Sequence, residues 1–384
     1  MPGAHSGLAW GCRRAGDTLA VMTSVSVLMP VLNEEAGIRE AIARLRRQRF
    51  PGELEFLIID GGSTDRTREI ISTAAASDAR IRLLDNPRRI IPAALNIGLH
   101  AASGEYIARM DAHTIYPDDY VRHGVARLQR GDVAWASGPQ VADGIDAATS
   151  RVALAQRTRL GIGGAAFRSA VEEIEVDTGY TGVLRRATLE HHRGWDERWP
   201  VNEDSELAAR IREEGGRIVC IPEMAAAYIP RATLRSLARQ YFRYGQYRAK
   251  TCRAHPASMR RSHIVPPALT VVVVAAVVLW DVPLAGWTAR AVVAAWAVAL
   301  LATAAAPLRR ATARDAAVVP AMLAATTRMM LVFVPDRSVA RVIASSDRIA
   351  DVPGARVAPG RSAVAAGGAE EIRAAGLRPV FQVR

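Results

Sequence analysis

The sequence is short of cysteine. Its 384 residues include only Cys12, Cys220 and Cys252, which are widely spaced. Three thiols cannot form a disulfide framework or a four-thiolate zinc site, so we expect the chain to fold in a reducing compartment. Aromatic residues are also scarce, at 5% of the chain, although 50% of its residues are hydrophobic. This hydrophobic content excludes a disordered protein, which could not bury enough apolar surface to offset its chain entropy.

Charged residues are missing from two long apolar segments, residues 264–280 and 291–308. Each approaches the roughly 20 residues that a helix needs to cross a bilayer. A third apolar stretch, residues 316–335, is interrupted by Arg328. Together they predict a transmembrane region over residues 264–335 with two or three helices. The alternative is that they are core helices of a soluble domain.

Basic residues collect on one side of this region. They are frequent in residues 231–263, whereas the link formed by residues 281–288 has none. Because Lys and Arg accumulate on the cytoplasmic side, we predict a multi-pass protein of the cell (inner) membrane with its N-terminal domain in the cytoplasm. Residues 231–263 are then a basic amphipathic helical segment at the membrane surface. Its basic residues are Arg231, Arg235, Arg239, Arg243, Arg248, Lys250, Arg253, Arg260 and Arg261.

The two ends of the chain have weaker signals. Arg13, Arg14 and Asp17 interrupt the apolar content of the start, which therefore does not read as a signal peptide. We predict a disordered leader over residues 1–22 and a flexible tail over residues 336–384.

The net charge is +12, from 50 Lys and Arg against 38 Asp and Glu. A basic chain favours a phosphate-containing partner, which could be nucleic acid, an anionic membrane surface or a nucleotide substrate. Much of the excess lies beside the predicted membrane segments, so we assign it to lipid headgroups and a nucleotide substrate. Nucleic acid is not an expected partner.

Residues 23–230 alternate between predicted strands and helices. Apolar runs predict strands at 24–30, 54–59, 81–84 and 106–110, and helical spacing predicts helices over 34–49, from 66, and over 92–100. This alternation predicts an α/β domain with a mostly parallel sheet and helices on both faces. Ligands of such sheets bind beyond the carboxyl ends of the strands.

Polar side chains follow three of the predicted strands. They are Asn33 and Glu34, the run from Asp60 to Asp65, and the pair Asp111 and His113. A carboxylate such as Asp60 could accept a hydrogen bond from a nucleobase or a sugar hydroxyl, although an ordinary strand-to-helix turn has the same composition. The sequence has neither the Gly-Lys-Ser/Thr of a P-loop nor the three-glycine dinucleotide fingerprint here, which disfavours ATP and NAD.

Asp111 and His113 lie two residues apart at the end of a buried strand. Two ligating side chains in this position could bind one divalent cation and leave other positions for phosphate oxygens and water. A carboxylate with an imidazole suits Mn²⁺ at least as well as Mg²⁺. The alternative for an isolated Asp-x-His is a surface turn, and the location at a strand end favours the metal site.

Two further groups lie later in the chain. Glu203 and Asp204 begin a predicted helix, where Asp204 could complement the helix dipole or act as a general base. Gln240 and Arg243 share one helical face, where the guanidinium could bind a phosphate. The same helix could instead lie on an anionic membrane surface.

Two glycine-containing segments, residues 161–164 and 177–182, are either ordinary turns or a lid and an acceptor-facing loop, respectively.

Taken in order, these motifs resemble those of family 2 inverting glycosyltransferases with a GT-A fold. Membrane-attached enzymes of the succinoglycan exopolysaccharide type are the most similar, because they too use Asp-Ala-His and carry C-terminal transmembrane helices. The resemblance covers residues 24–255. Its motifs here are Pro30-Val31-Leu32-Asn33-Glu34, Asp60-Gly61-Gly62-Ser63-Thr64-Asp65, Asp111-Ala112-His113, Glu203-Asp204 and Gln240-Tyr241-Phe242-Arg243-Tyr244.

The resemblance implies a catalytic domain over residues 23–230 and a role for each matching residue. On the donor side, Asp60 would contact the base, Asp111 would position the donor or the metal, and His113 would be a metal ligand. The residues that would line the nucleoside are Pro30, Val31 and Glu34.

On the acceptor side, the resemblance implies that Asp204 deprotonates the acceptor hydroxyl, with Glu203 as a second catalytic carboxylate beside it. Gln240 and Arg243 match Gln-x-x-Arg-Trp, a motif that contacts the donor diphosphate and the acceptor, with Tyr244 in place of Trp. That motif is best developed in processive synthases, so Tyr244 and the small membrane region argue against processivity.

The implied function is metal-dependent transfer of a sugar, with inversion, from a nucleotide-sugar such as a UDP-sugar to a lipid-linked saccharide acceptor. The setting is exopolysaccharide or cell-surface glycan biosynthesis, with Mn²⁺ or Mg²⁺ as cofactor. A catalytically inactive nucleotide-sugar-binding membrane scaffold is the alternative, but it would lack an intact base and metal set, and both are present. A transporter would need polar groups in its membrane segments, where Arg328 is nearly alone. The sugar, acceptor and linkage stay open.

Overall fold

The computed structural model describes residues 23–157, 168, 170–230 and 233–260, with single residues and short stretches between positions 263 and 298. Among these residues, no helix is both long and apolar enough to cross a membrane. The predicted membrane segments fall wholly or largely outside the described residues, and so do the leader, the tail and residues 161–164. Those expectations stay predictions.

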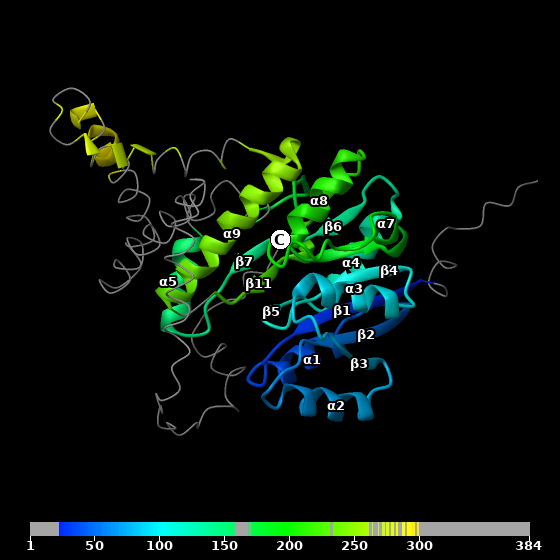
Figure 1. Ribbon diagram of the computed structural model, residues 1–384. Helices are drawn as coiled ribbons and strands as arrows, with labels where there is room; N and C mark the ends of the chain where they lie inside the picture. The colour runs from blue at the N-terminus through cyan, green and yellow to red at the C-terminus, as the bar shows by residue number, and fades with distance from the viewer. Residues whose placement is uncertain are drawn as a thin grey trace, which may run out of the picture. The chain divides into compact units, whose positions relative to one another are not determined.

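A large mixed sheet forms the centre of the domain (Figure 1). Its strands are β1 (Ser24–Val31), β2 (Glu53–Asp60), β3 (Ile81–Asp85), β4 (Tyr106–Arg109), β6 (Trp135–Ser137), β8 (Ile174–Glu175), β9 (Gly182–Arg185) and β10 (Ile218–Cys220). They lie in the order β3-β2-β1-β4-β9-β6-β10-β8. β9 runs antiparallel to β4 and β6, and β8 antiparallel to β10, whereas the other neighbours are parallel. The mostly parallel α/β sheet predicted from the sequence is confirmed.

Helices pack on both faces of this sheet. On one face lie α1 (Ile38–Arg46), α2 (Thr67–Ser77) and α4 (Tyr120–Gln129), and on the other α3 (Ile91–Ala101), α7 (Arg186–His191) and α8 (Glu203–Glu213). Successive side chains of a strand point to opposite faces, so Val27 and Met29 of β1 enter one core and Leu28 the other. The apolar run Val27-Leu28-Met29 of β1 is typical of a strand that is buried on both faces.

The helix predicted over residues 34–49 is shorter than expected. Its first residues form a turn, in which the amides of Gly37 and Ile38 donate to the carbonyl of Glu34 at 2.9 and 2.8 Å, and α1 begins at Ile38. Glu34 therefore stays in the loop after β1, at the end of the strand.

The carboxyl ends of β2, β1 and β4 meet at one edge of the sheet. These three strands are neighbours, and the pairing register places Val31 opposite Asp60 and Leu28 opposite Arg109. The three polar clusters predicted to form a ligand site therefore follow adjacent parallel strands.

A smaller sheet begins directly after His113. Its order is β5-β11-β7, with β5 (Thr114–Ile115), β7 (Gln140–Ala142) and β11 (Ala226–Tyr228). The remaining elements are α5 (Ala147–Gln156), α9 (Leu234–Ala254) and short 3₁₀ helices at Pro222–Met224 and Pro256–Ser258.

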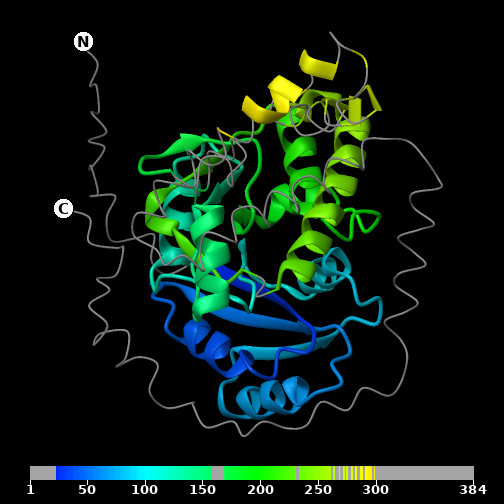
Figure 2. The ribbon, with the colours of Figure 1, turned by 90° about the vertical axis from the view of Figure 1, so that its left-hand side faces the viewer.

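The helix predicted around Gln240 and Arg243 is α9, which lies beside α8 in both views (Figures 1 and 2). Trp199 Nε1 and Asn202 Nδ2 each donate to Thr251 Oγ1 at 3.0 Å. These bonds fix α9 against the turn that precedes Glu203 and Asp204.

Candidate active site

The loops after β1 and β2 are bonded to each other. Asn33 accepts a hydrogen bond from the amide of Thr64 at 2.8 Å through its side chain, and its own amide donates to Ser63 Oγ at 2.9 Å. The φ of Asn33 is 54°, a left-handed conformation that Asn adopts more readily than most residues. The amide of Glu34 donates to Thr67 Oγ1 at 2.8 Å. Two of the three predicted polar clusters therefore form one continuous surface.

Asp60 ends β2 with its side chain fully buried. The carboxylate accepts hydrogen bonds from the amide of Ser63 at 3.2 Å and from its hydroxyl at 2.5 Å, and it pairs with Arg68 at 3.3 Å. These contacts hold the carboxylate in one orientation at the sheet edge. Its contact with a nucleobase stays a prediction.

The residues expected to line the nucleoside differ in exposure. The Val31 side chain belongs to the hydrophobic core, and its carbonyl accepts a hydrogen bond from the amide of Gly61 at 2.9 Å. Pro30 and Glu34 are half-buried. A ligand at this edge could therefore contact the side chains of Pro30 and Glu34, whereas the Val31 side chain is occupied by core packing.

A buried arginine connects two of the predicted groups. Arg109, the last residue of β4, donates to both carboxylate oxygens of Asp111 at 2.9 and 3.2 Å and to Glu203 Oε1 at 2.8 Å. We call Arg109, Asp111 and Glu203 the buried triad. It joins Asp111, a predicted metal ligand, to the first residue of α8, a separation of more than 90 positions along the chain.

Burial and ion pairing have opposite effects on the pKa of each carboxyl in the buried triad. Burial raises the pKa of Glu203 to about 7, although the charge of Arg109 opposes the rise. Burial would also raise the pKa of Asp111, but Arg109 and then His113 hold that pKa below its ordinary value. Asp111 is therefore an ionised acceptor at neutral pH, whereas Glu203 lies close to its titration point.

Tyr180 joins Asp111 to His113. Its hydroxyl donates to Asp111 Oδ2 at 2.9 Å and lies 3.5 Å from His113 Nε2. The His113 side chain is exposed and meets the ring of Tyr228 edge-on at 5.8 Å. The two predicted metal ligands therefore share one neighbour. That neighbour comes from residues 177–182, the loop expected to face the acceptor.

Asp204 lies beside the buried triad in the first turn of α8. Its side chain accepts a hydrogen bond from the amide of Ser205 at 2.7 Å, and the residue is half-buried. Burial raises the pKa of Asp204, more than the positive charges of Arg109 and Arg248 lower it. A partly exposed carboxylate with a raised pKa is a stronger base than an ordinary aspartate and can still reach a substrate.

Helix α9 contributes both predicted residues. Gln240 Nε2 donates to the hydroxyls of Tyr228 at 3.1 Å and Tyr244 at 3.0 Å. Because Tyr228 also contacts His113, Gln240 is linked to a predicted metal ligand. Arg243 is exposed and makes no hydrogen bond or ion pair with any other described residue. Its guanidinium is therefore available to a ligand.

Sequence reasoning missed Arg109, Tyr180 and Arg248. A signal existed for Arg109, because a charged residue next to the buried run Tyr106-Ile107-Ala108 must find a partner. Tyr180 lies within residues 177–182, which the sequence singled out, but no signal marked its side chain. Arg248, which donates to Ser205 Oγ at 3.0 Å, was counted only among the basic residues of the membrane-facing segment.

The side chains of Asp111 and His113 have atoms that could bind a divalent cation. Asp111 Oδ2 accepts two hydrogen bonds and Oδ1 one, so Oδ1 keeps accepting capacity. The imidazole of His113 is exposed. One carboxylate oxygen and one imidazole fit a cation that takes its remaining ligands from phosphate and water, as Mn²⁺ and Mg²⁺ do.

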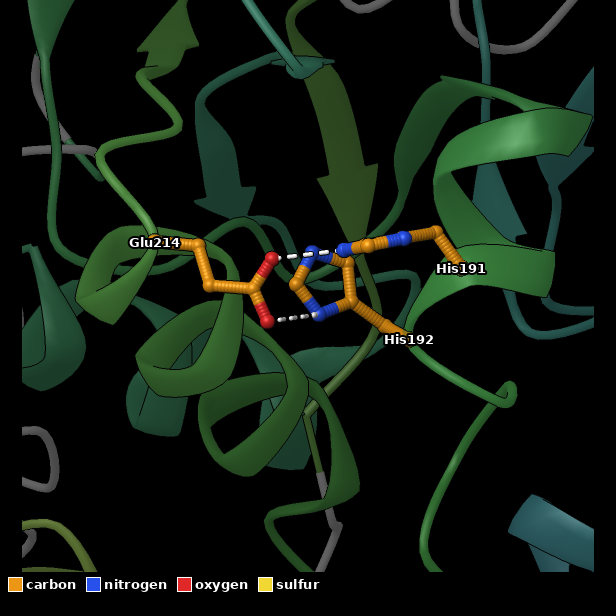
Figure 3. A group of neighbouring side chains, drawn as sticks. All are labelled: His191, His192 and Glu214. Atoms are coloured by element: carbon orange, nitrogen blue, oxygen red, sulfur yellow. Dashed lines mark hydrogen bonds and ion pairs between the residues drawn. The ribbon is translucent and has the colours of Figure 1, made fainter.

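A second group of side chains lies at the other end of α8. Among the described residues, His191, His192 and Glu214 are the group whose potential metal-ligand atoms all lie within 4.8 Å of one another (Figure 3). We call them the His-His-Glu cluster. Glu203 and Glu214 are separated by the length of α8, about 16 Å at 1.5 Å per residue. The cluster is therefore distinct from the candidate active site.

Comparison with known proteins identifies relatives. Residues 26–193 match the family described as Glycosyl transferase family 2. The chain is 35% identical over 282 residues to the succinoglycan biosynthesis protein ExoA of Rhizobium meliloti (strain 1021), which covers 73% of this chain and 84% of that protein. It is 25% identical over 235 residues to a dolichyl N-acetyl-alpha-D-glucosaminyl phosphate 3-beta-D-2,3-diacetamido-2,3-dideoxy-beta-D-glucuronosyltransferase of Methanococcus voltae, covering 58% of this chain and 72% of that protein.

One solved structure is similar over most of the chain. It is the mannosyltransferase PcManGT from Pyrobaculum calidifontis in complex with GDP-Man and Mn²⁺, with a TM-score of 0.54 and 22% identity over 82% of this chain and 87% of that one. At this identity the likeness concerns the fold alone. It agrees with the GT-A fold expected from the sequence motifs.

Proposed function

The chain belongs to glycosyltransferase family 2 and is a glycosyltransferase, and we propose that it transfers a sugar with inversion from a nucleotide-sugar donor to a lipid-linked saccharide acceptor. The proposed setting is exopolysaccharide or cell-surface glycan biosynthesis at the cytoplasmic face of the cell membrane. The name of the succinoglycan relative supports this setting. A nucleotide-sugar donor is supported by the GDP-Man in the similar structure, and the sequence motifs favour a UDP-sugar.

The observation that carries the proposal is the arrangement around Arg109. Arg109 binds Asp111 on the donor side and Glu203 on the acceptor side, and Asp204 follows Glu203 directly. A group-transfer enzyme needs its donor site and its base held in a fixed relation, because misplacement of the reacting atoms lowers the rate steeply. The buried triad supplies such a connection through three hydrogen bonds.

Asp204 is the proposed general base. A sugar hydroxyl is a poor nucleophile at neutral pH, and a positioned carboxylate that accepts its proton contributes typically about 10²–10⁴-fold to the rate. The raised pKa of Asp204 improves the proton transfer while its partial exposure admits the hydroxyl. Glu203 is buried against Arg109, so we assign it a positioning role beside the base. Attack on the face opposite the leaving group inverts the anomeric carbon.

The leaving diphosphate gains negative charge during transfer. Arg243, exposed on α9, is the proposed phosphate contact, and Gln240 lies one turn before it. Electrostatic stabilisation of developing charge by a fixed cation is a large contribution in such reactions. Asp111 and His113 would hold the divalent cation, which when bound offsets further charge on the diphosphate.

Membrane attachment belongs to the same proposal. The basic segment over residues 231–263 would lie on anionic lipid, with the apolar segments that follow it in the bilayer. Reporter fusions after Asp281 and Asp336 test this topology. We expect the reporter fused after Asp281 to lie outside the cytoplasm, and a cytoplasmic location would contradict the predicted topology.

The proposed activity is tested by incubating the protein, in the membranes that contain it, with a panel of nucleotide sugars. Release of nucleoside diphosphate that depends on one donor and on the lipid fraction is expected. The competing function is an inactive nucleotide-sugar-binding scaffold, and it predicts donor binding without release.

The proposed metal dependence has its own test. We expect a chelator to abolish release and Mn²⁺ or Mg²⁺ to restore it. Full activity in excess chelator would contradict the proposal that His113 is a metal ligand.

A further inference from the structure

The His-His-Glu cluster lies where the chain reverses direction after α7. His191 is the last residue of α7, and His192 follows it. The chain then turns through Arg193 and Gly194, whose φ values are 59° and 69°, and the amide of Gly194 donates to the carbonyl of Leu189 at 2.8 Å. Two consecutive left-handed residues make a sharp turn. Both imidazoles consequently project from one short, well-defined piece of backbone.

Helix α8 holds this turn in place. Arg210 donates to the carbonyl of His192 and, at 2.9 Å, to the carbonyl of Gly194. The same guanidinium pairs with Glu206 at 2.8 Å, which fixes its own orientation. Glu214 lies one helical turn beyond Arg210. The element that supplies the carboxylate is therefore also the element that fixes the backbone carrying the two histidines.

The three side chains bring their potential ligand atoms within 4.8 Å of one another. Figure 3 shows each imidazole facing one oxygen of the Glu214 carboxylate. His191 Nε2 lies 2.7 Å from Oε2, and His192 Nδ1 lies 3.7 Å from Oε1. The rings are nearly perpendicular, at 85°, with centroids 5.0 Å apart. In a tetrahedral zinc site with bonds of about 2.0–2.1 Å, ligand atoms lie roughly 3.3 Å apart. The observed separations bracket this value.

A simple ion pair accounts for only part of this arrangement. His191 and Glu214 could form one by themselves, but the second imidazole is also directed at the carboxylate from a distance beyond a hydrogen bond. Within the described part of the chain, His192 Nδ1 has no hydrogen-bond partner. The His192 side chain is 6% exposed, whereas His191 and Glu214 are 67% and 57% exposed. One ligand position is thus fixed, and the other two side chains are free to adjust to an ion.

We propose that His191, His192 and Glu214 form a binding site for a transition-metal dication of the Zn²⁺ class. Two imidazoles and one carboxylate are a donor set that Zn²⁺ accepts, with a water molecule as fourth ligand. Mg²⁺ and Ca²⁺ prefer oxygen ligands throughout, so they are not the expected occupants. This site is independent of the proposed transferase function and of the cation at Asp111 and His113.

An ion bound at this position would affect the stability of α8. The segment from His192 to Glu214 contains the turn that contacts α9 and all of α8, with Glu203 and Asp204 in its first turn. An ion bound at both ends closes this segment into a loop. A cross-link that closes a loop reduces the conformational freedom of the unfolded chain. Bound metal is therefore expected to stabilise the helix that carries the proposed base.

The test measures Zn²⁺ binding to the full-length chain, freed of metal by a chelator and purified without a histidine tag. Calorimetric titration with zinc chloride is expected to show one tight site per chain. His191→Ala and Glu214→Gln change exposed side chains and should fold normally, and each is expected to weaken this site roughly tenfold or more. Zn²⁺ should also raise the melting temperature of the wild type and not of these variants.

Two control variants test whether Zn²⁺ binding depends on the His-His-Glu cluster and not on other histidines. His100→Ala removes an exposed histidine outside the cluster, and His113→Ala removes the predicted ligand at the active site; both are expected to keep the tight site. Visible absorption of Co²⁺ in place of Zn²⁺ would report tetrahedral coordination in the wild type. The proposal is overturned if no tight site exists, if His191→Ala and Glu214→Gln bind as tightly as wild type, or if His113→Ala alone loses the binding.

Discussion

Arg109 and Arg127 each pair with two carboxylates, in different surroundings. Arg109 holds the carboxylates of the buried triad, Asp111 and Glu203, whose side chains are 5% and 7% exposed. Arg127 pairs with Asp132 at 2.6 Å and Glu173 at 2.9 Å, whose side chains are 48% and 35% exposed. We call the second group the surface triad. The arginines themselves are equally covered, so the two groups differ in the solvation of their acids.

The pKa values of Asp132 and Glu203 shift in opposite directions. Hydrogen bonding to Arg127 lowers the pKa of Asp132 to about 2, whereas burial raises the pKa of Glu203 to about 7. An ion pair favours the charged form and desolvation disfavours it. An arginine partner therefore does not by itself determine the charge of a carboxyl. In the buried triad the loss of water outweighs the ion pair at Glu203, which is next to the proposed base.

The largest expected difference concerns stability. Arg109→Met leaves two buried carboxylates without their positively charged partner, and we expect the free energy of unfolding to fall by about 3–5 kcal/mol. Arg127→Met leaves acids that water can solvate, so the expected loss is about 1 kcal/mol or less. Chemical denaturation of both full-length variants measures the difference. If both variants lose the same free energy of unfolding, the solvent exposure of the acids does not explain the difference between the buried triad and the surface triad.

The next difference is in the pH dependence of stability. The pKa of Glu203 is about 7 in the folded chain and 4.5 ordinarily, so between these pH values the folded state binds more protons than the unfolded state. The free energy of unfolding therefore falls as the pH rises from 4.5 to 7. Glu203→Gln should remove this fall, about 1.4 kcal/mol for each unit of pKa difference. Asp132 has its pKa lowered from 3.8 to about 2, so its contribution is lost as pH falls through that lower window.

Thermal denaturation from pH 4 to pH 8 compares Glu203→Gln with Asp132→Asn as its matched control. The control should keep the wild-type slope between pH 4.5 and 7. A flat wild-type profile in that window, or an unchanged slope in Glu203→Gln, would contradict the raised pKa of Glu203.

The smallest expected effect concerns a single hydroxyl at the edge of the buried triad. Tyr180→Phe removes the hydrogen bond to the charged Asp111, which should cost about 1.5 kcal/mol and lower kcat/KM roughly tenfold. Tyr120→Phe removes a buried hydroxyl that bonds to the neutral Thr181 at 2.9 Å, and its kcat/KM should stay within about twofold of wild type. Initial rates of nucleoside diphosphate release measure both, and equal rates for the two variants would count against Tyr180.

Much of the region proposed to bind the donor could be predicted from the sequence, because local patterns determine its strands and polar clusters. The apolar runs that became β1, β2 and β4 are short, alternate with helical segments and end in polar residues, so the rule for parallel sheets places those ends together. Hydrogen bonds among Asn33, Ser63 and Thr64 show that two of the predicted clusters meet.

The rest depends on long-range contacts that no local pattern encodes. β9 inserts antiparallel between β4 and β6, and it follows the loop that brings Tyr180 to Asp111. The partner of Arg109 on α8 is distant in the sequence, so the charge in a buried strand indicated that a partner was needed without identifying Glu203. The start of α1 was also misplaced, because Glu34 forms a turn with helix-like spacing.

The central claim is that Asp204, held beside the buried triad, is the base of the transfer. The most direct measurement is the rate of nucleoside diphosphate release by Asp204→Asn at saturating donor and acceptor. We predict a fall in kcat of about 10²–10⁴-fold, with donor affinity and melting temperature near those of the wild type. The matched variant Asp132→Asn should show the wild-type rate. Near-normal turnover by Asp204→Asn would contradict the claim.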